Sequence, residues 1–503
     1  VLSCGVPHSH VYSTLVDSEF ARFFYYDRSV HISVLDLKER NDQIIFAKMI
    51  RQLRARPPKG FGVIDQIEAD LMTNPQSLKA ASTLPTVAQT HRPASSDIFP
   101  LGKGTTFTFP YKDEQKHTAY RTVKLLSVLF RAHTIIGRGT IVIKVECACD
   151  FCGGQCDWAG KKLILKISFP PEDRVAEHTF LDRCREKAVG EHAWVLKHLP
   201  KIYHSFEMPF GIDTPQHNLK KRFQGDYEMR ILRGSIQEEL QPLSELRTAQ
   251  EFAQVYFDVV QCHHWVYTYP KILHRDISDG NIMFREEEGK IYGVLNDWDL
   301  ALLDPETESS PTSKFRTGTK PFLAHEQHGS EWIGPHRYRH DLESMFYVIL
   351  LQTCLHDAPT AQPSIEPIPG DHQFGFWHNL DDESLLQSKN LLIHARAWLP
   401  PVTEFFTSFT SWLTDMQQSF DAGFHALKHR DDSRLVPRRK FGQLLVPTMG
   451  DVDDVTLGGS ISYDEFVISM HQFGDQLLEV RGNGWRQKLD QLKDEYFRTH
   501  ERS

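Results

Sequence analysis

The stretch ILHRDISDGNIMF, residues 272–284, places a polar cluster between two apolar flanks. Asp276 and Asn281 stand five residues apart in this cluster, which we expect to form one loop. An aspartate in such a loop can accept a proton from an attacking hydroxyl, while the amide oxygen of an asparagine can bind a hard cation such as Mg²⁺. An ion-pair cluster of His274, Arg275 and Asp276 that only braces a turn is the alternative.

A second carboxylate follows in the sequence VLNDWDLAL, where Asp297 ends a short apolar strand. A carboxylate at the end of a strand can hold Mg²⁺ against the phosphates of a nucleotide. The two stretches together predict a site that accepts a proton from a hydroxyl and holds a nucleotide through its metal ion.

The motifs spread over residues 100–480 resemble those of protein kinases, and within them the fungal-specific protein kinase group. Residues 274–281 carry the HRDxxxxN pattern of the catalytic loop in full. NDWDLA stands where other kinases have DFG, and residues 317–327, TGTKPFLAHEQ, are similar to the end of an activation segment, with AHE replacing APE. HDLESMFYVILL resembles the helix whose first aspartate, here Asp341, braces the backbone of the catalytic loop.

The resemblance implies a role for each residue of these motifs. Asp276 would be the catalytic base, with His274 and Arg275 as the other members of the HRD motif. Asn281 and Asp297 would hold Mg²⁺, and ATP would be the phosphoryl donor. The acceptor would be a protein hydroxyl, with serine or threonine favoured over tyrosine.

The chain before this loop should supply the residues that bind the phosphates. Lys166 lies inside the apolar run LILKIS and is the candidate for the lysine that contacts the α- and β-phosphates; an exposed lysine on an edge strand is the alternative. Glu191 is the candidate for the helix-borne glutamate that pairs with this lysine, with Glu186 as second choice. Gly137 and Gly139 begin a glycine-rich loop whose backbone N–H groups would cover the phosphates.

Several positions depart from the family pattern. Val142 stands where the third glycine of the loop belongs, which weakens the expected grip on the phosphates. Trp298 and Asp299 replace the phenylalanine and the glycine of DFG, so we expect this segment to flip less readily. Ser278 stands where serine/threonine kinases usually carry a lysine that contacts the transferred phosphoryl group.

The segment between Asp297 and Glu326 is rich in hydroxyl side chains, namely Ser309, Ser310, Thr312, Ser313, Thr317 and Thr319. A phosphate on one of them would pair with Arg275 and order the segment. We therefore predict activation by an upstream kinase or by autophosphorylation. The alternative is that these are simply polar loop residues.

Cys147, Cys149, Cys152 and Cys156 fall within an insertion at residues 146–160, which follows the glycine-rich loop. Four thiolates can enclose a tetrahedral Zn²⁺, although the spacings C-x-C, C-x-x-C and C-x-x-x-C differ from two separate CxxC knuckles. Reduced loop thiols are the alternative. Because the remaining cysteines are scattered and no secretory signal is visible, we expect an intracellular protein, cytoplasmic or nuclear.

The order of the predicted elements indicates an α+β fold with the two lobes of a protein kinase. Residues 1–80 form an expected α+β accessory domain, and residues 81–100 are a linker rich in Ser, Thr, Ala and Pro. We expect a β-rich N-lobe at 101–235, a helical C-lobe at 236–480 and a C-terminal tail at 481–503.

Local patterns predict where several helices lie. Thr248 with Glu251, and Ser462 with Glu465, have the S/T-x-x-E spacing of a capping box, so a helix should follow each. A further helical pattern covers residues 186–199.

The composition narrows the class of partner. The chain has 503 residues, 40% hydrophobic and 24% charged, the balance of an ordinary globular protein. Its net charge of -9 at pH 7 gives no global attraction to nucleic acid or anionic lipid. The longest apolar run, residues 345–351, is far shorter than the roughly 20 residues of a membrane span. We expect a protein substrate as partner, with neither nucleic acid nor membrane.

Two other functions share these motifs. A small-molecule kinase of the aminoglycoside or choline type would use the same Asp/Asn pair, but Arg275 and the AHE sequence after a long segment argue against it. A pseudokinase acting as a binding module would fit the missing third glycine and the DWD sequence. Against that alternative, all the catalytic side chains are present.

Overall fold

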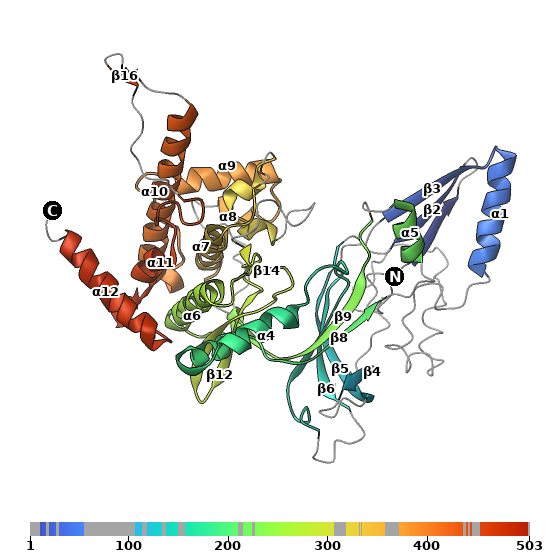
Figure 1. Ribbon diagram of the computed structural model, residues 1–503, viewed down its shortest axis with the longest axis horizontal. Helices are drawn as coiled ribbons and strands as arrows, with labels where there is room; N and C mark the ends of the chain where they lie inside the picture. The colour runs from blue at the N-terminus through green and yellow to red at the C-terminus, as the bar shows by residue number, and fades with distance from the viewer. Residues whose placement is uncertain are drawn as a thin grey trace. The chain divides into compact units, whose positions relative to one another are not determined.

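The computed structural model of the protein divides the chain into two compact units. The first unit comprises Val1–Arg174 and Lys201–Glu239, and the second comprises Val175–Pro200 and Leu240–Ser503. Figure 1 labels the helices and strands of both. The structure describes residues 11–16, 20–26, 30–54, 106–112, 118–132, 137–148, 156–209, 215–223, 227–305, 318–330, 332, 334–357, 372–435, 439–440, 443–444 and 453–500.

A small antiparallel sheet with one helix begins the first unit. Its strands, paired in chain order, are β1 (Val11–Val16), β2 (Phe20–Tyr26) and β3 (Val30–Asp36). In helix α1 (Arg40–Arg54), Met49 and Ile50 pack against Ala21 and Leu35 of the sheet. This part is α+β, as predicted, while its independence as an accessory domain stays a prediction.

A six-stranded antiparallel sheet forms the rest of the first unit, in the order β4-β5-β6-β7-β9-β8. Its strands are β4 (Thr106–Lys112), β5 (Thr118–Arg131), β6 (Ile141–Cys147), β7 (Leu163–Ser168), β8 (Ile202–Pro209) and β9 (Ile231–Glu238), and helix α5 (Pro215–Phe223) lies between β8 and β9 in the chain. Every residue of β7 is buried, because this strand has neighbours on both edges and packs in the apolar core.

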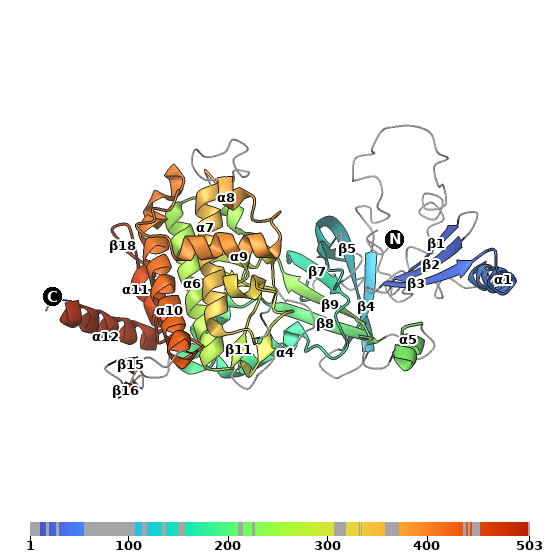
Figure 2. The same cartoon turned by 90° about the horizontal axis from the view of Figure 1, so that it is seen from above.

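The second unit is mainly helical. Its helices are α4 (Glu177–Lys187), η2 (Gly190–His198), η4 (Leu243–Glu245), α6 (Ala249–Thr268), η6 (Lys320–Phe322), η7 (His325–His328), α7 (Tyr338–Leu355), α8 (His372–Gly375), α9 (Asp382–Ile393), η8 (Glu404–Phe409), α10 (Thr410–Leu435), α11 (Tyr463–Met470) and α12 (Asn483–His500). Helix α10 packs against α7, α9 and α11 (Figures 1 and 2). Among the described helices, none is both long enough and apolar enough to cross a bilayer.

Short strands complete the second unit. They are β10 (Gln241–Pro242), β11 (Ile272–Leu273), β12 (Ile282–Glu287), β13 (Lys290–Leu295), β14 (Leu302–Leu303), β15 (Arg439–Lys440), β16 (Gln443–Leu444), β17 (Gln472–Phe473) and β18 (Gln476–Leu477). The β12–β13 hairpin turns through Glu288 and Gly289, both with positive φ, which suits the twist of a tight hairpin.

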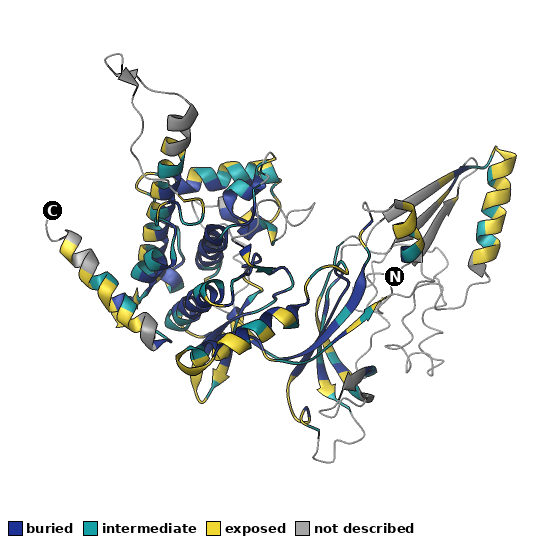
Figure 3. Cartoon of the chain, in the orientation of Figure 1, coloured by how far each residue is buried: buried dark blue, intermediate teal, exposed yellow. Residues whose placement is uncertain are grey.

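The capping signals are confirmed. Thr248 accepts a hydrogen bond from the backbone of Glu251, whose side chain bonds back to the backbone of Thr248, so α6 begins at a complete capping box. Ser462 likewise accepts from the backbone N–H of Glu465 at the start of α11. Helix α7 is buried along most of its length, as its apolar sequence indicates (Figure 3).

The prediction of a single helix over residues 186–199 is wrong. Helix α4 ends at Lys187, and a separate 3-10 helix, η2, begins at Gly190. Gly190 has a φ of 58°, a left-handed backbone conformation that interrupts an α-helix and that glycine adopts without steric cost. The helix of this region therefore lies earlier in the chain than its apolar pattern suggests.

A buried ion pair joins α6, β13 and the C-terminal part of the chain. Asp258 on α6 accepts hydrogen bonds from the backbone N–H of Gly293 at 3.0 Å and from Gln254 Nε2 at 2.8 Å. Arg481 contacts both carboxylate oxygens, at 2.8 and 3.0 Å. A Cβ on Gly293 would lie 2.4 Å from the carbonyl oxygen of Val255, so only glycine lets β13 approach α6 this closely.

We expect Arg481→Ala to lower the free energy of unfolding of the second unit by about 3–5 kcal/mol, because Asp258 would stay buried without a counter-charge. Lys488→Ala is the matched control, since it removes an ion pair with Asp464 between partly exposed side chains and should cost less than about 1 kcal/mol. Urea denaturation of both variants measures the difference. Equal losses of stability would contradict the importance assigned to Asp258.

Candidate active site

Two short strand pairs bring the two motif loops together in the second unit. Residues 274–281 connect β11 to β12, and residues 296–301 connect β13 to β14. Because β11 pairs with β14 and β12 pairs with β13, both ends of each loop are fixed next to the ends of the other. The backbone N–H of Asn296 also donates to the carbonyl of Asn281 at 2.8 Å. The geometry therefore places the two predicted loops side by side.

The carboxylate of Asp276 is buried and held by two side chains. Asn281 Nδ2 donates to the backbone carbonyl of Asp276 at 2.8 Å and to its Oδ2 at 3.2 Å. Thr319 Oγ1 donates to Asp276 Oδ1 at 2.9 Å. Since Asn281 directs its Nδ2 at Asp276, its Oδ1 points elsewhere and suits a hard cation.

Two non-glycine residues of these loops have a left-handed backbone. The φ angles are 67° at Arg275 and 57° at Asp297, a conformation that L-residues adopt rarely and at a cost. At Arg275 the surroundings enforce it. Its N–H and that of His274 donate to Asp341 Oδ2 at 3.1 and 3.2 Å, and its Nε donates to the carbonyl of Leu300 at 2.8 Å.

Asp341 is the acceptor on which this backbone depends. Besides the two N–H groups, His263 Nε2 lies 2.8 Å from Oδ2 and His336 Nε2 lies 2.8 Å from Oδ1. Burial alone would raise the pKa of Asp341, but the interactions with His336 and His263 hold it well below the ordinary value. Burial also lowers the pKa of His336, so we treat this imidazole as a neutral hydrogen-bond donor. Asp341 is thus a buried carboxylate with four donors, as its predicted bracing role requires.

His274 links the two loops through its ring. Burial lowers the pKa of His274 to about 4, so the imidazole is neutral near pH 7. Its Nε2 lies 3.0 Å from the carbonyl of Asn296, while the N–H of Asp276 donates to its Nδ1 at 3.3 Å. The ring of the fully buried Trp298 meets it edge to face, with centroids 4.8 Å apart. His274 therefore positions other residues and has no charge to offer a substrate.

Glu177, which the sequence reasoning missed, contacts the second loop. It is the first residue of α4, only 7% exposed, and its Oε1 accepts a hydrogen bond from the backbone N–H of Trp298 at 3.0 Å. The predicted Glu191 lies instead on η2 with a 72% exposed side chain, 3.9 Å from His192 Nε2. The second choice, Glu186, is exposed on α4. The structure brings neither of the predicted glutamates to the motif loops.

Lys166 lies in the first unit, on a central strand. It is buried on β7 between β6 and β9, so the alternative of an exposed lysine on an edge strand is wrong. Its register partners are Val142 and Ser235. Val142 is therefore inside strand β6, where a β-branched residue is favoured, and the glycine-rich loop is confined to the residues before it.

The predicted glycines adopt the backbone that a tight loop needs. Gly137 and Gly139 have φ angles of 109° and 55°, and the carbonyl of the intervening Arg138 accepts a hydrogen bond from the N–H of Phe169 at 2.7 Å. The loop is thereby tied to the residue that follows β7. Its contact with phosphates stays a prediction.

The segment that carries Thr319 is anchored to α7. Glu326, in the AHE sequence, accepts hydrogen bonds from Arg339 at 2.8 Å and from His340 Nε2 at 2.6 Å. Burial opposes ionisation, but His340 and Arg339 hold the pKa of Glu326 well below its ordinary value. Glu343 accepts from the backbone N–H of His325 at 2.7 Å. The other predicted phosphorylation positions, Ser309, Ser310, Thr312, Ser313 and Thr317, lie outside the described residues.

The cysteine cluster is described only at its two ends. Cys147 and Cys156 have their Sγ atoms 3.4 Å apart, and Arg121 donates to Cys156 Sγ at 3.8 Å. Cys149 and Cys152 lie outside the described residues, so a four-thiolate zinc site stays a prediction.

Residues 203–354 match the family model described as fungal protein kinase, so the predicted resemblance is confirmed over that segment. Solved structures similar to the chain include vaccinia related kinase 3, at 14% identity and a TM-score of 0.39, covering 69% of this chain and 89% of that one. Another is the kinase PK-1 of Cydia pomonella granulovirus, at 12% identity and a TM-score of 0.36, covering 69% and 93%. No match was found among curated proteins.

We expect Asp341→Asn to expose the backbone amides of His274 and Arg275 to exchange, because the amide group that replaces the carboxylate cannot accept all four donors. Hydrogen–deuterium exchange of a peptide covering these residues should be faster by about tenfold or more, for an opening free energy lowered by about 1–3 kcal/mol. Asp381→Asn, at the exposed N-cap of α9, is the control and should leave that peptide unchanged. Unaltered exchange in Asp341→Asn would show that the loop does not depend on this carboxylate.

Proposed function

We propose that this chain, with its fungal protein kinase match over residues 203–354, is an ATP-dependent protein kinase that transfers the γ-phosphoryl group to a protein hydroxyl, with serine or threonine favoured. The observation that carries the proposal is the buried carboxylate of Asp276, oriented by Asn281 and Thr319. An oriented carboxylate is what a general base for hydroxyl attack requires.

The other motif residues fit the remaining tasks. Asn281 and Asp297 would hold Mg²⁺, which, when bound, offsets the charge that develops on the transferred phosphoryl group. Lys166, a cation enclosed in an apolar strand, would bind the α- and β-phosphates beneath the loop of Gly137 and Gly139. The residues of the chain would position the nucleotide and orient the attacking hydroxyl, and Asp276 would accept its proton.

We assign the helix-borne glutamate to Glu177 rather than to Glu191. A carboxylate that positions a site must itself be shielded from water, because exposed polar contacts contribute little. Glu177 is buried and already bonded to the backbone beside Asp297, whereas Glu191 is exposed. The assignment rests on the kinase proposal.

Regulation and location follow from the same proposal. A phosphate on the segment before Thr319 would pair with Arg275 and order the loop, added by an upstream kinase or by the chain itself. The protein would act inside the cell, in the cytoplasm or nucleus, on a protein substrate and without nucleic acid or membrane.

Asp276→Asn should lower the rate of phosphoryl transfer from labelled ATP by about 10²–10⁴-fold, because the amide cannot accept the proton of the attacking hydroxyl. Asp279→Asn changes an exposed carboxylate of the same loop and should keep the wild-type rate. The assay supplies Mg²⁺, a mixed peptide library and, separately, small alcohols and amines. Transfer to the small acceptors alone would favour a small-molecule kinase. Nucleotide binding without any transfer by the wild type would favour a pseudokinase.

Glu177→Gln should raise KM for ATP and lower kcat/KM by about tenfold or more, because the neutral amide accepts the backbone N–H of Trp298 more weakly than the carboxylate does and so loosens the loop of Asp297. Glu191→Gln should leave both constants within about twofold, as surface substitutions usually do. Steady-state kinetics at varied ATP concentration compares the two. A loss confined to Glu191→Gln would restore the assignment made from the sequence.

A further inference from the structure

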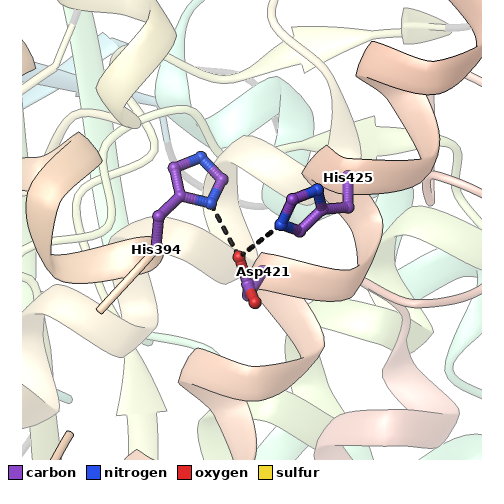
Figure 4. A group of neighbouring side chains, drawn as sticks. All are labelled: His394, Asp421 and His425. Atoms are coloured by element: carbon purple, nitrogen blue, oxygen red, sulfur yellow. Dashed lines mark hydrogen bonds and ion pairs between the residues drawn. The ribbon is translucent and has the colours of Figure 1, made fainter. Parts of the chain in front are cut away.

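A compact cluster of two histidines and one aspartate lies on the second unit, away from the motif loops in sequence. His394 immediately follows α9, and Asp421 and His425 stand one turn apart on α10 (Figure 4). Asp421 Oδ1 lies 2.7 Å from His394 Nδ1 and 3.5 Å from His425 Nε2, and the three ligand atoms all lie within 4.8 Å of one another. Side chains from two helical elements thus converge on one point.

The backbone beneath this cluster is fixed. Gln417, buried on α10 one turn before Asp421, donates through Nε2 to the carbonyls of Leu392, Ile393 and Ala395, which flank His394. The last turn of α9 is therefore fastened to α10 at the level of the cluster. Preorganisation of this kind reduces the entropy that three separate side chains lose when they bind one ion.

From this geometry we propose that His394, Asp421 and His425 bind a Zn²⁺ ion. Imidazole nitrogen and carboxylate oxygen are ordinary zinc ligands at about 2.0–2.2 Å, and a tetrahedral site of that radius separates its ligand atoms by about 3.3 Å. The distance between Asp421 Oδ1 and His425 Nε2, 3.5 Å, is close to that value. The distance between Asp421 Oδ1 and His394 Nδ1, 2.7 Å, needs to lengthen by only about 0.6 Å. The fourth position would be taken by water, since the three side chains are between 37% and 71% exposed.

The ion would brace α9 against α10. It would replace a hydrogen bond between His394 and Asp421, which is exposed and adds little stability in water. The three ligands meet only in the folded chain, so zinc would raise the free energy of unfolding with the logarithm of its concentration above Kd. Because the ligands come from α9 and α10, the stabilisation would resist the separation of these two helices.

The test is zinc binding by the full chain in a Cys147→Ser/Cys156→Ser background with excess Mg²⁺, which removes two thiol ligands and saturates sites for hard cations. Equilibrium dialysis against Zn²⁺ counts ions per chain, and thermal unfolding is followed across the same concentrations. We expect one ion per chain and a rise in Tm with zinc. His394→Ala and His425→Ala should each weaken zinc binding by about 100-fold and abolish the rise in Tm. Even the loss of a residue that only hydrogen-bonds to a metal ligand commonly lowers metal affinity by about 10–100-fold.

His378→Ala is the matched control, because it removes an exposed histidine of the same unit outside the cluster. It should leave stoichiometry, affinity and Tm shift unchanged. Circular dichroism without zinc checks that the variants remain folded, as expected for partly exposed positions. Loss of binding in His378→Ala, equal binding in all three variants, or no binding by the unsubstituted cluster would each overturn the proposal and leave a hydrogen-bonded His–Asp–His group.

Discussion

The candidate active site depends on one buried carboxylate. Asp341 receives the backbone N–H groups of His274 and Arg275 and the side chains of His263 and His336. Without an acceptor at this point, two buried N–H groups would lack a partner and the left-handed backbone at Arg275 would lose its support. The position of Asp276, the predicted base, therefore depends on the side chain of Asp341, which lies 65 residues later in the chain. The lowered pKa of His336 suits this arrangement, because a neutral imidazole donates without adding a second buried charge.

Strand pairs position the two motif loops of the candidate site, and side-chain hydrogen bonds position the segment that carries Thr319. The β11–β14 and β12–β13 pairs bring the two motif loops to the same place, and the rings of His274 and Trp298 fill the space between them. The segment that carries Thr319 and Glu326 is fixed separately, through the bonds of Glu326 to α7. Thr319 then reaches Asp276 from a third direction. Strand pairing, the bonds of Glu326 and the bond of Thr319 therefore each fix a different part of the surroundings of Asp276.

The sequence predicted what is local and missed what is tertiary. The loop around Asp276 and Asn281, the capping boxes and the buried Lys166 all rest on contiguous patterns, and the structure describes each where it was expected. Glu191 was preferred to Glu186 because apolar residues follow it at helical spacing, but Gly190 interrupts the helix that this choice assumed. Phe180, Leu181 and Cys184 are buried on α4 at the same kind of spacing and could have located the earlier helix. No local sequence pattern predicts the contact between His263 and Asp341, since 78 residues separate them.

Trp298 has a consequence for chemical inhibition. Its indole is fully buried, bonded through Nε1 to the carbonyl of Leu295, and packed edge-on against His274. An inhibitor that binds only after this side chain has left its place would have to open a cavity the size of an indole, at a cost of about 3–5 kcal/mol. That penalty corresponds to a loss of more than about a hundredfold in affinity. Compounds that leave the indole in place would not incur this cost.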